Sequence, residues 1–99
     1  MKYVGFWTIK PENMEKAIEA YTKVLTLKPG EGVNAHFPRG ISENYNFCGQ
    51  NKGLQIFEVE NPDQLTAVTA HYNPHIQFEF IPVDDAQNTS KVFMKVKKM

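Results

Sequence analysis

A histidine and the chain's only arginine lie three positions apart in the segment His36-Phe37-Pro38-Arg39-Gly40. A guanidinium can hold a carboxylate or phosphate through two parallel hydrogen bonds, and a nearby imidazole can accept a proton near neutral pH. We therefore predict that Arg39 anchors an anionic ligand and that His36 is a candidate catalytic base. The alternative is a solvated loop in which Arg39 makes a surface ion pair of little energetic value.

A second candidate base is Glu58, which is predicted to share a strand face with Leu54 and Ile56. A carboxyl group in a partly apolar cleft is suited to general-base chemistry, whereas one near a strand end more often reaches solvent. Three further residues, Trp7, Asn44 and Tyr45, are predicted to line a ligand site with aromatic and polar groups. Ordinary packing within a sheet is the alternative for all three.

Metal and cofactor motifs are missing from the sequence. His71 and His75 have the spacing that places two imidazoles on one helix face, but Pro74 between them ends a helix and no third ligand is nearby. The single Cys48 forms no intramolecular disulfide. There is also no glycine-rich phosphate loop and no nucleophile elbow, so we expect neither a metal nor a cofactor.

The charge balance argues against nucleic-acid and membrane partners. The 11 basic residues equal the 11 acidic residues in number, so no global field favours polyanions. RNA-recognition strands read basic, glycine, aromatic, small, aromatic, but after Lys52-Gly53 this chain has leucine and isoleucine where the stacking aromatics belong. No apolar run approaches about 18 residues. We expect a cytoplasmic protein.

The elements that must position these residues follow the order strand, helix, strand, strand, helix, strand. Hydrophobic periodicity and turn residues place them at residues 2–9, 11–27, 44–48, 54–59, 62–72 and 75–83. A long loop over residues 30–43 is predicted to contain a short strand at 33–37. Residues 1–83 thus form one α+β domain of ferredoxin-like βαββαβ type, with two helices on one face of an antiparallel sheet. Residues 84–99 form a docked, partly mobile tail with one short helix.

The strands predict a homodimer, because both of their faces are apolar. In the first strand Val4 and Phe6 alternate with Tyr3 and Trp7. Two helices of this length cover only one face of a sheet, and a large exposed apolar face usually marks an interface. The alternative is that the tail folds across the second face.

In its strand order and in three local features, the chain resembles a family of short uncharacterised prokaryotic proteins of the dimeric α+β barrel superfamily. These features are the Lys10-Pro11 helix start, the strand-to-helix step at residues 57–62 and the segment Ile81-Pro82-Val83-Asp84-Asp85-Ala86. The resemblance implies two sheets packed face to face, with a small-molecule cleft between the sheet and the helices of each subunit. Members include cofactor-free monooxygenases, isomerases and ligand-sensing domains, and fold alone does not choose among them.

The sequence therefore predicts a dimeric domain that binds a small aromatic or carboxylate metabolite. A cofactor-independent enzyme would use Arg39 as anion anchor and His36 or Glu58 as base. The alternative is a non-catalytic dimerisation, regulatory or ligand-sensing domain.

Overall fold

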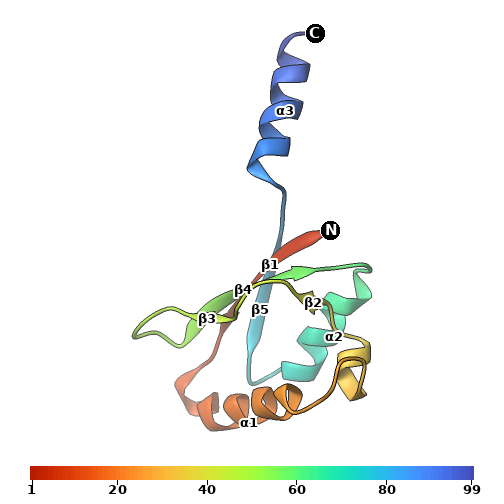
Figure 1. Ribbon diagram of the computed structural model, residues 1–99. Coiled ribbons are helices and arrows are strands. Elements are labelled where there is room, and N and C mark those ends of the chain that lie inside the picture. The colour runs from red at the N-terminus through yellow and green to blue at the C-terminus, as the bar shows by residue number, and fades with distance from the viewer.

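One antiparallel sheet, two helices packed on it and one projecting helix make up the computed structural model, which describes all residues 1–99 (Figure 1). The strands are β1 (Lys2–Thr8), β2 (Arg39–Gly40), β3 (Tyr45–Asn46), β4 (Lys52–Glu58) and β5 (Gln77–Val83). The helices are α1 (Met14–Leu25), α2 (Asp63–Tyr72) and α3 (Ala86–Lys97), with short 3-10 helices η1 (Pro11–Asn13) and η2 (Gly32–Ala35).

The strand order β2-β4-β1-β5, with β3 also paired to β4, places β4 and β1 in the middle and leaves β5, which is equally long, at an edge. Both neighbours of β1 are antiparallel to it, and Gly5 pairs with Gln55 on one side and Phe80 on the other. A Cβ atom at Gly5 would lie 2.9 Å from the rings of both Phe57 and Phe80. Glycine is therefore the residue that lets these two rings meet over the centre of the sheet, at a centroid distance of 6.2 Å.

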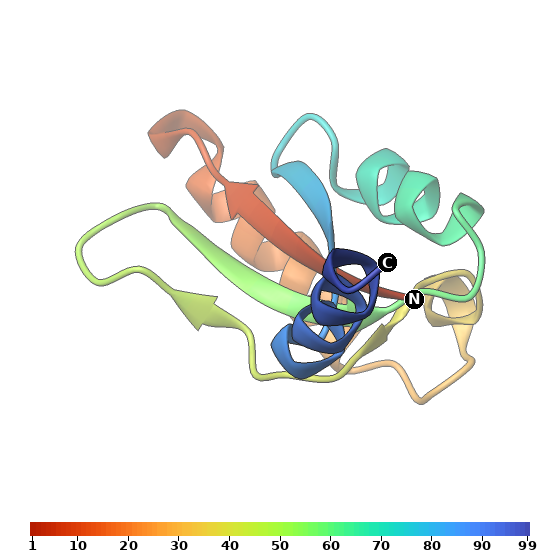
Figure 2. The ribbon, with the colours of Figure 1, turned by 90° about the horizontal axis from the view of Figure 1, so that it is seen from above.

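Helices α1 and α2 cover the same face of the sheet (Figures 1 and 2). Their contact with the sheet forms a small core of Ile9, Ala17, Val68, Tyr72 and Ile76. At the start of helix α2, Asn61 Oδ1 accepts a 2.8 Å hydrogen bond from the Asp63 amide, and Gln64 Oε1 accepts one from the Asn61 amide at 3.4 Å. Only nine of the 99 residues are buried, so most apolar side chains reach the surface.

The strand predicted at residues 44–48 is reduced to the two residues of β3, and the other short strand, β2, lies within the predicted loop over residues 30–43. Between them the Ser42 hydroxyl accepts a 2.9 Å hydrogen bond from the Ile56 amide, a position that a backbone carbonyl would otherwise fill. The predicted strand at residues 33–37 is wrong, because these residues include most of the 3-10 helix η2. With β2 and β3 taken together, the element order is consistent with the ferredoxin-like prediction.

Strand pairing assigns every strand residue to one of two faces, because directly paired residues point the same way. Trp7, Phe57 and Phe78 face the helices on what we call the inner face. The opposite, outer face is also apolar, as the sequence predicts, and carries no helix. Its apolar residues are Val4, Phe6, Ile41, Tyr45, Leu54, Ile56, Ile81 and Val83.

The tail differs most from its prediction. Residues 86–97 form the 12-residue helix α3, where only a short helix was expected. This helix follows β5 and stands clear of the domain on the side of the outer face (Figure 1). Viewed nearly along its axis, α3 rises above the sheet (Figure 2). The expectation of a docked tail is therefore wrong. None of the helices has the length and apolar character needed to cross a lipid bilayer.

Candidate functional site

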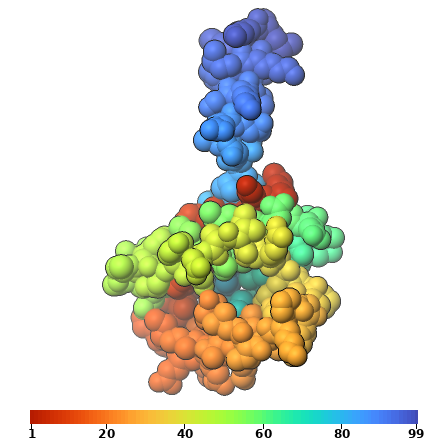
Figure 3. Space-filling view, viewed as in Figure 1, coloured from red at the N-terminus to blue at the C-terminus, as the bar shows by residue number.

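A cavity of about 680 Å³ lies between the inner face of the sheet and helix α1. It opens between α1 and the segment that contains β2 and β3, where the space-filling surface is hollowed (Figure 3). Of its 23 lining residues, 14 are hydrophobic, so the walls favour an apolar ligand. The aromatic lining residues are Trp7, Tyr21, Phe37, Phe57, Tyr72 and Phe78.

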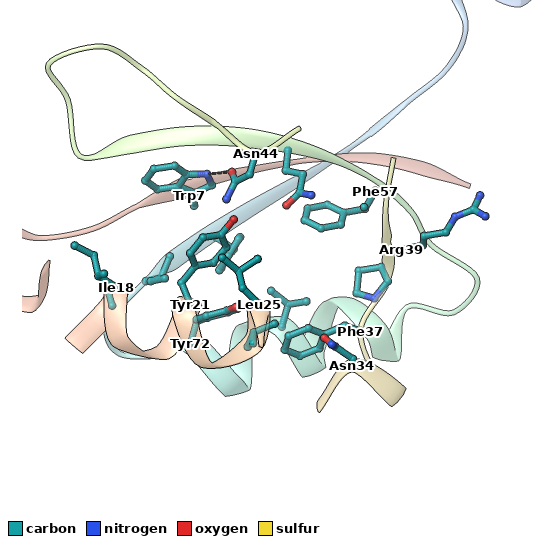
Figure 4. A pocket seen from close by; sticks show the side chains of 18 of the residues that line it. Trp7, Ile18, Tyr21, Leu25, Asn34, Phe37, Arg39, Asn44, Phe57 and Tyr72 are labelled. Atoms are coloured by element: carbon teal, nitrogen blue, oxygen red, sulfur yellow. Dashed lines mark hydrogen bonds between the residues drawn. The ribbon is translucent and has the colours of Figure 1, made fainter. Parts of the chain in front are cut away.

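Trp7 and Asn44 form the most specific polar contact in the cavity wall (Figure 4). The indole Nε1 donates to Asn44 Oδ1 at 2.8 Å, which joins the end of β1 to the segment that precedes β3. Because the amide oxygen is engaged, the amide nitrogen of Asn44 is directed into the cavity as a donor. Asn44 can therefore present a hydrogen-bond donor to a ligand acceptor.

Two tyrosines, Tyr21 of α1 and Tyr72 of α2, bring phenol groups to the cavity. Tyr72 is only 5% exposed, and burial raises its pKa to about 12, with a further contribution from the neighbouring Tyr21. The Tyr72 phenol is therefore protonated throughout the physiological range. It can donate or accept a hydrogen bond but is unsuited to act as a general base.

Arg39 is the only charged residue among those that line the cavity. Its backbone pairs with Glu58 in the sheet, and its exposed guanidinium points away from the cavity (Figure 4). It also lines a smaller cavity of about 210 Å³ next to Glu58, Glu60 and Gln64. Arg39 thus lies at the rim with its guanidinium on the side of Glu58, and its long side chain would have to turn toward the opening to reach an anion that projects from the cavity.

The six residues predicted as a site divide into two groups. Trp7, Asn44 and Arg39 line the cavity, whereas His36, Glu58 and Tyr45 do not. His36 is an exposed residue at the end of η2. Glu58 Oε1 accepts a 3.0 Å hydrogen bond from the N-terminal ammonium group. Tyr45 pairs with Leu54, which places it on the outer face, 57% exposed.

Sequence reasoning missed the two tyrosines and Gln55. Tyr21 is part of the apolar spacing of its helix, so it reads as core rather than as a lining residue. Gln55 pairs with Gly5 and therefore shares the inner face with Trp7. A polar residue on the same face as aromatic residues is a signal that strand alternation alone could have provided.

The two remaining histidines, His71 and His75, are not part of a cluster that could bind a metal ion. The ring of His71 meets those of Phe37 and Tyr72 edge to face, with centroids 5.6 Å and 4.8 Å apart. Helix α2 ends at Tyr72, before His75, so the two imidazoles do not follow one helix face. No group of three or more histidine, cysteine, aspartate or glutamate residues converges in the structure.

Comparison with protein families places residues 1–97 in one family, described as a domain of unknown function, DUF3303. No curated protein matches the chain.

Proposed function

The chain belongs to the DUF3303 family, whose description assigns no activity, and we propose that it is a homodimeric protein that binds a small aromatic carboxylate in the cavity beneath its sheet. The observation that carries this proposal is the pairing of a large apolar cavity with a single cation at its rim.

The size and lining of the cavity support a small, ring-containing ligand. Small-molecule sites commonly enclose about 300–1,000 Å³ and combine apolar walls with a few placed polar groups. Here the walls are aromatic, and the polar groups include the amide of Asn44 and the phenol of Tyr72. Aromatic rings favour offset or edge-to-face contact with a second ring, which adds to the area that the ligand buries.

The distribution of charge supports a ligand with one anionic group. A carboxylate inside the uncharged part of the cavity would lose its hydration without gaining a partner, which is costly. At the rim it can meet Arg39 while the ring occupies the interior. The proposed orientation is therefore ring inward and carboxylate outward.

Binding, or ligand sensing, fits the site better than catalysis. The two candidate bases, His36 and Glu58, lie outside the cavity lining, and Glu58 is engaged by the N-terminal ammonium group. A general base must come within hydrogen-bond reach of the proton that it removes. The lining residues supply donors, acceptors and aromatic walls, which are the features of a recognition site.

The uncovered outer face supports the homodimer. Tyr45 and Ile81 on this face are more than 40% exposed, and no helix of the same chain packs over them. Because equivalent surfaces meet across a two-fold axis, a face that is apolar across several strands is self-complementary. Packing two such faces would remove from water the apolar surface that the monomer leaves exposed.

A thermal-shift experiment with matched acids and amides tests the ligand class. Benzoate and phenylacetate would each be compared with benzamide and phenylacetamide, which have similar shapes but no charge. We expect the acids to raise the melting temperature more than the amides; a ligand at about 100 times its dissociation constant adds about 2.7 kcal/mol. Equal stabilisation by an acid and its amide would contradict the role of the anionic group, and no stabilisation by any of the four would contradict the aromatic ligand class.

A further inference from the structure

Helix α3 has an apolar stripe that its own domain leaves uncovered. Val92, Phe93 and Val96 follow helical spacing and are 52%, 63% and 62% exposed, and Met99 lies on the same side just beyond the helix end. A helix of only 12 residues is close to the length below which isolated helices are marginal in water. The stripe therefore needs a surface to pack against.

The charges of the chain are segregated between α3 and the rest. All 11 acidic residues lie in residues 1–85, together with seven of the 11 basic residues, which gives this part a formal charge of −4. The remaining four basic residues, Lys91, Lys95, Lys97 and Lys98, give the tail a charge of +4. Residues 1–85, which we call the body, are thus electrostatically complementary to the tail of the same chain. The body of a second copy offers the tail the same complementarity.

The position of α3 directs it toward a second copy. The helix rises on the side of the outer face, the same side on which the two sheets are proposed to meet (Figures 1 and 2). Nine of the 12 large hydrophobic residues that are exposed belong either to the outer face or to the tail. Because both surfaces lie on one side of the molecule, a copy seated on the outer face comes within reach of α3.

The area of the sheet indicates that α3 is needed for a stable dimer. Three strands of seven residues cover about 23 by 14 Å, so two facing sheets bury roughly 600 Å², which is below the range of about 1,200–2,000 Å² for stable interfaces. A 12-residue helix is about 18 Å long and 10 Å wide, and two such arms docked on the opposite copies add roughly 700 Å². Sheets and arms together reach the lower end of that range.

We infer that α3 is an exchanged arm: its stripe of Val92, Phe93, Val96 and Met99 packs on the body of a second copy of this chain, and its lysines face the acidic body of that copy. Two-fold symmetry makes the exchange reciprocal. The inference rests on the homodimer proposed above and adds that the arms, in addition to the sheets, hold the two copies together.

Sedimentation analysis of the full chain tests the arm exchange. The variant Val92→Ser/Val96→Ser disrupts the stripe, and Met94→Ser is the matched control because Met94 is also half exposed but lies on the opposite side of α3. We expect the wild type to be a dimer at micromolar concentration. The stripe variant is expected to raise the dimer dissociation constant at least about 100-fold, because each dimer loses four buried valines. The control is expected to change it less than about threefold.

The salt dependence and the alternatives give distinct outcomes. If the lysines face the acidic body, the wild-type dissociation constant rises with salt between about 0.05 and 0.5 M, because screening weakens the attraction. A dimer that the stripe variant leaves unchanged overturns the arm exchange while the sheet-mediated dimer stands. A monomeric wild type overturns both the arm exchange and the sheet-mediated dimer. This holds whether the arm of the monomer folds back on its own sheet or binds vesicles of phosphatidylserine and phosphatidylcholine.

Discussion

The indole of Trp7 and the carboxamide of Asn44 are joined by a 2.8 Å hydrogen bond across 37 positions of the chain. This bond fixes the irregular segment between β2 and β3 to the end of the central strand β1. It also orients both side chains at the mouth of the cavity, so the shape of the proposed ligand site depends on it.

Replacing Asn44 by alanine should loosen this end of the cavity. The half-buried indole would lose its acceptor, and we expect a loss of about 0.5–1.5 kcal/mol in the free energy of unfolding. Trp7 is the only tryptophan, so its fluorescence emission should shift to longer wavelength as water approaches the ring. Asn46→Ala is a suitable control, because Asn46 donates only to the carbonyl of the adjacent Phe47. Equal effects of the two substitutions would show that the hydrogen bond has no special role.

Replacing Arg39 by alanine should weaken binding of benzoate without affecting stability. Loss of a charge-assisted hydrogen-bonded pair is expected to cost about 1.5–3 kcal/mol of binding free energy, whereas an exposed side chain contributes little to folding. Arg39→Lys should restore only part of the affinity, because an ammonium group lacks the planar fork. Calorimetric titration measures both changes, and Lys16→Ala removes an equal charge from an exposed position outside the cavity lining. Similar affinities for all four proteins would place Arg39 outside the site.

Replacing Gly5 by alanine should destabilise the fold from the centre of the sheet. The added methyl group would lie 2.9 Å from the rings of Phe57 and Phe80, so both rings would have to move. Overpacking of this kind is expected to cost about 1–3 kcal/mol in urea denaturation. A second substitution, Phe80→Leu, should cost less in the Gly5→Ala background than in the wild type, because the smaller side chain makes room. Additive costs would argue against this steric explanation.

Tyr72 should make stability fall in alkaline solution. Its pKa is raised from 10.0 to about 12 in the folded state, so between these values the folded protein holds a proton that the unfolded chain has released. The stabilisation is complete below about pH 10 and is lost as the pH rises toward 12, an effect of at most about 3 kcal/mol. Tyr72→Phe should flatten this part of the curve of unfolding free energy against pH. Spectrophotometric titration should show one of the four tyrosines ionising later than the others. An identical alkaline slope in the variant would disprove the assignment.

Asp85 should set the start of the arm. Its Oδ1 accepts a 2.7 Å hydrogen bond from the Gln87 amide at the first turn of α3. Asp85→Ala is expected to cost about 1 kcal/mol of helix stability, which circular dichroism of the full chain would detect as lost helicity. Asp85→Asn should retain most of the signal, because asparagine caps helices as well as aspartate does. Unchanged helicity in the alanine variant would show that packing alone maintains α3.

Strand alternation predicted the two faces of the sheet because side chains repeat every two residues in any strand. Trp7 and Val4 therefore lie on opposite faces as expected. The same rule did not place Tyr45, because its face depends on how the chain re-enters the sheet after Ser42. There a side-chain hydroxyl replaces a backbone partner, and a hydrogen bond of this kind has no sequence period.

The site was only partly predictable for a related reason. Trp7 and Asn44 were predicted to line a ligand site because one is aromatic and the other polar, and both do line the cavity. Their hydrogen bond, however, connects segments whose relative position follows from tertiary packing. His36 and Arg39 are close in sequence, yet the turn after η2 leaves only Arg39 at the rim. The tail was predicted to have one short helix, capped by Asp84 and Gln87, followed by an end in which lysines alternate with apolar residues. The helical spacing of Val92, Phe93 and Val96 was the stronger pattern.

The edge position of β5 also affects how this protein avoids unwanted association. A free edge strand offers unpaired amide and carbonyl groups that can template strand addition and aggregation. Pro82 has no amide hydrogen, so it removes one donor from this strand, and Glu79 adds a charge. The edge is therefore protected against strand addition, which disfavours growth of a continuous sheet from chain to chain. The outer face has no such protection, so two copies can still pair face to face in a closed dimer.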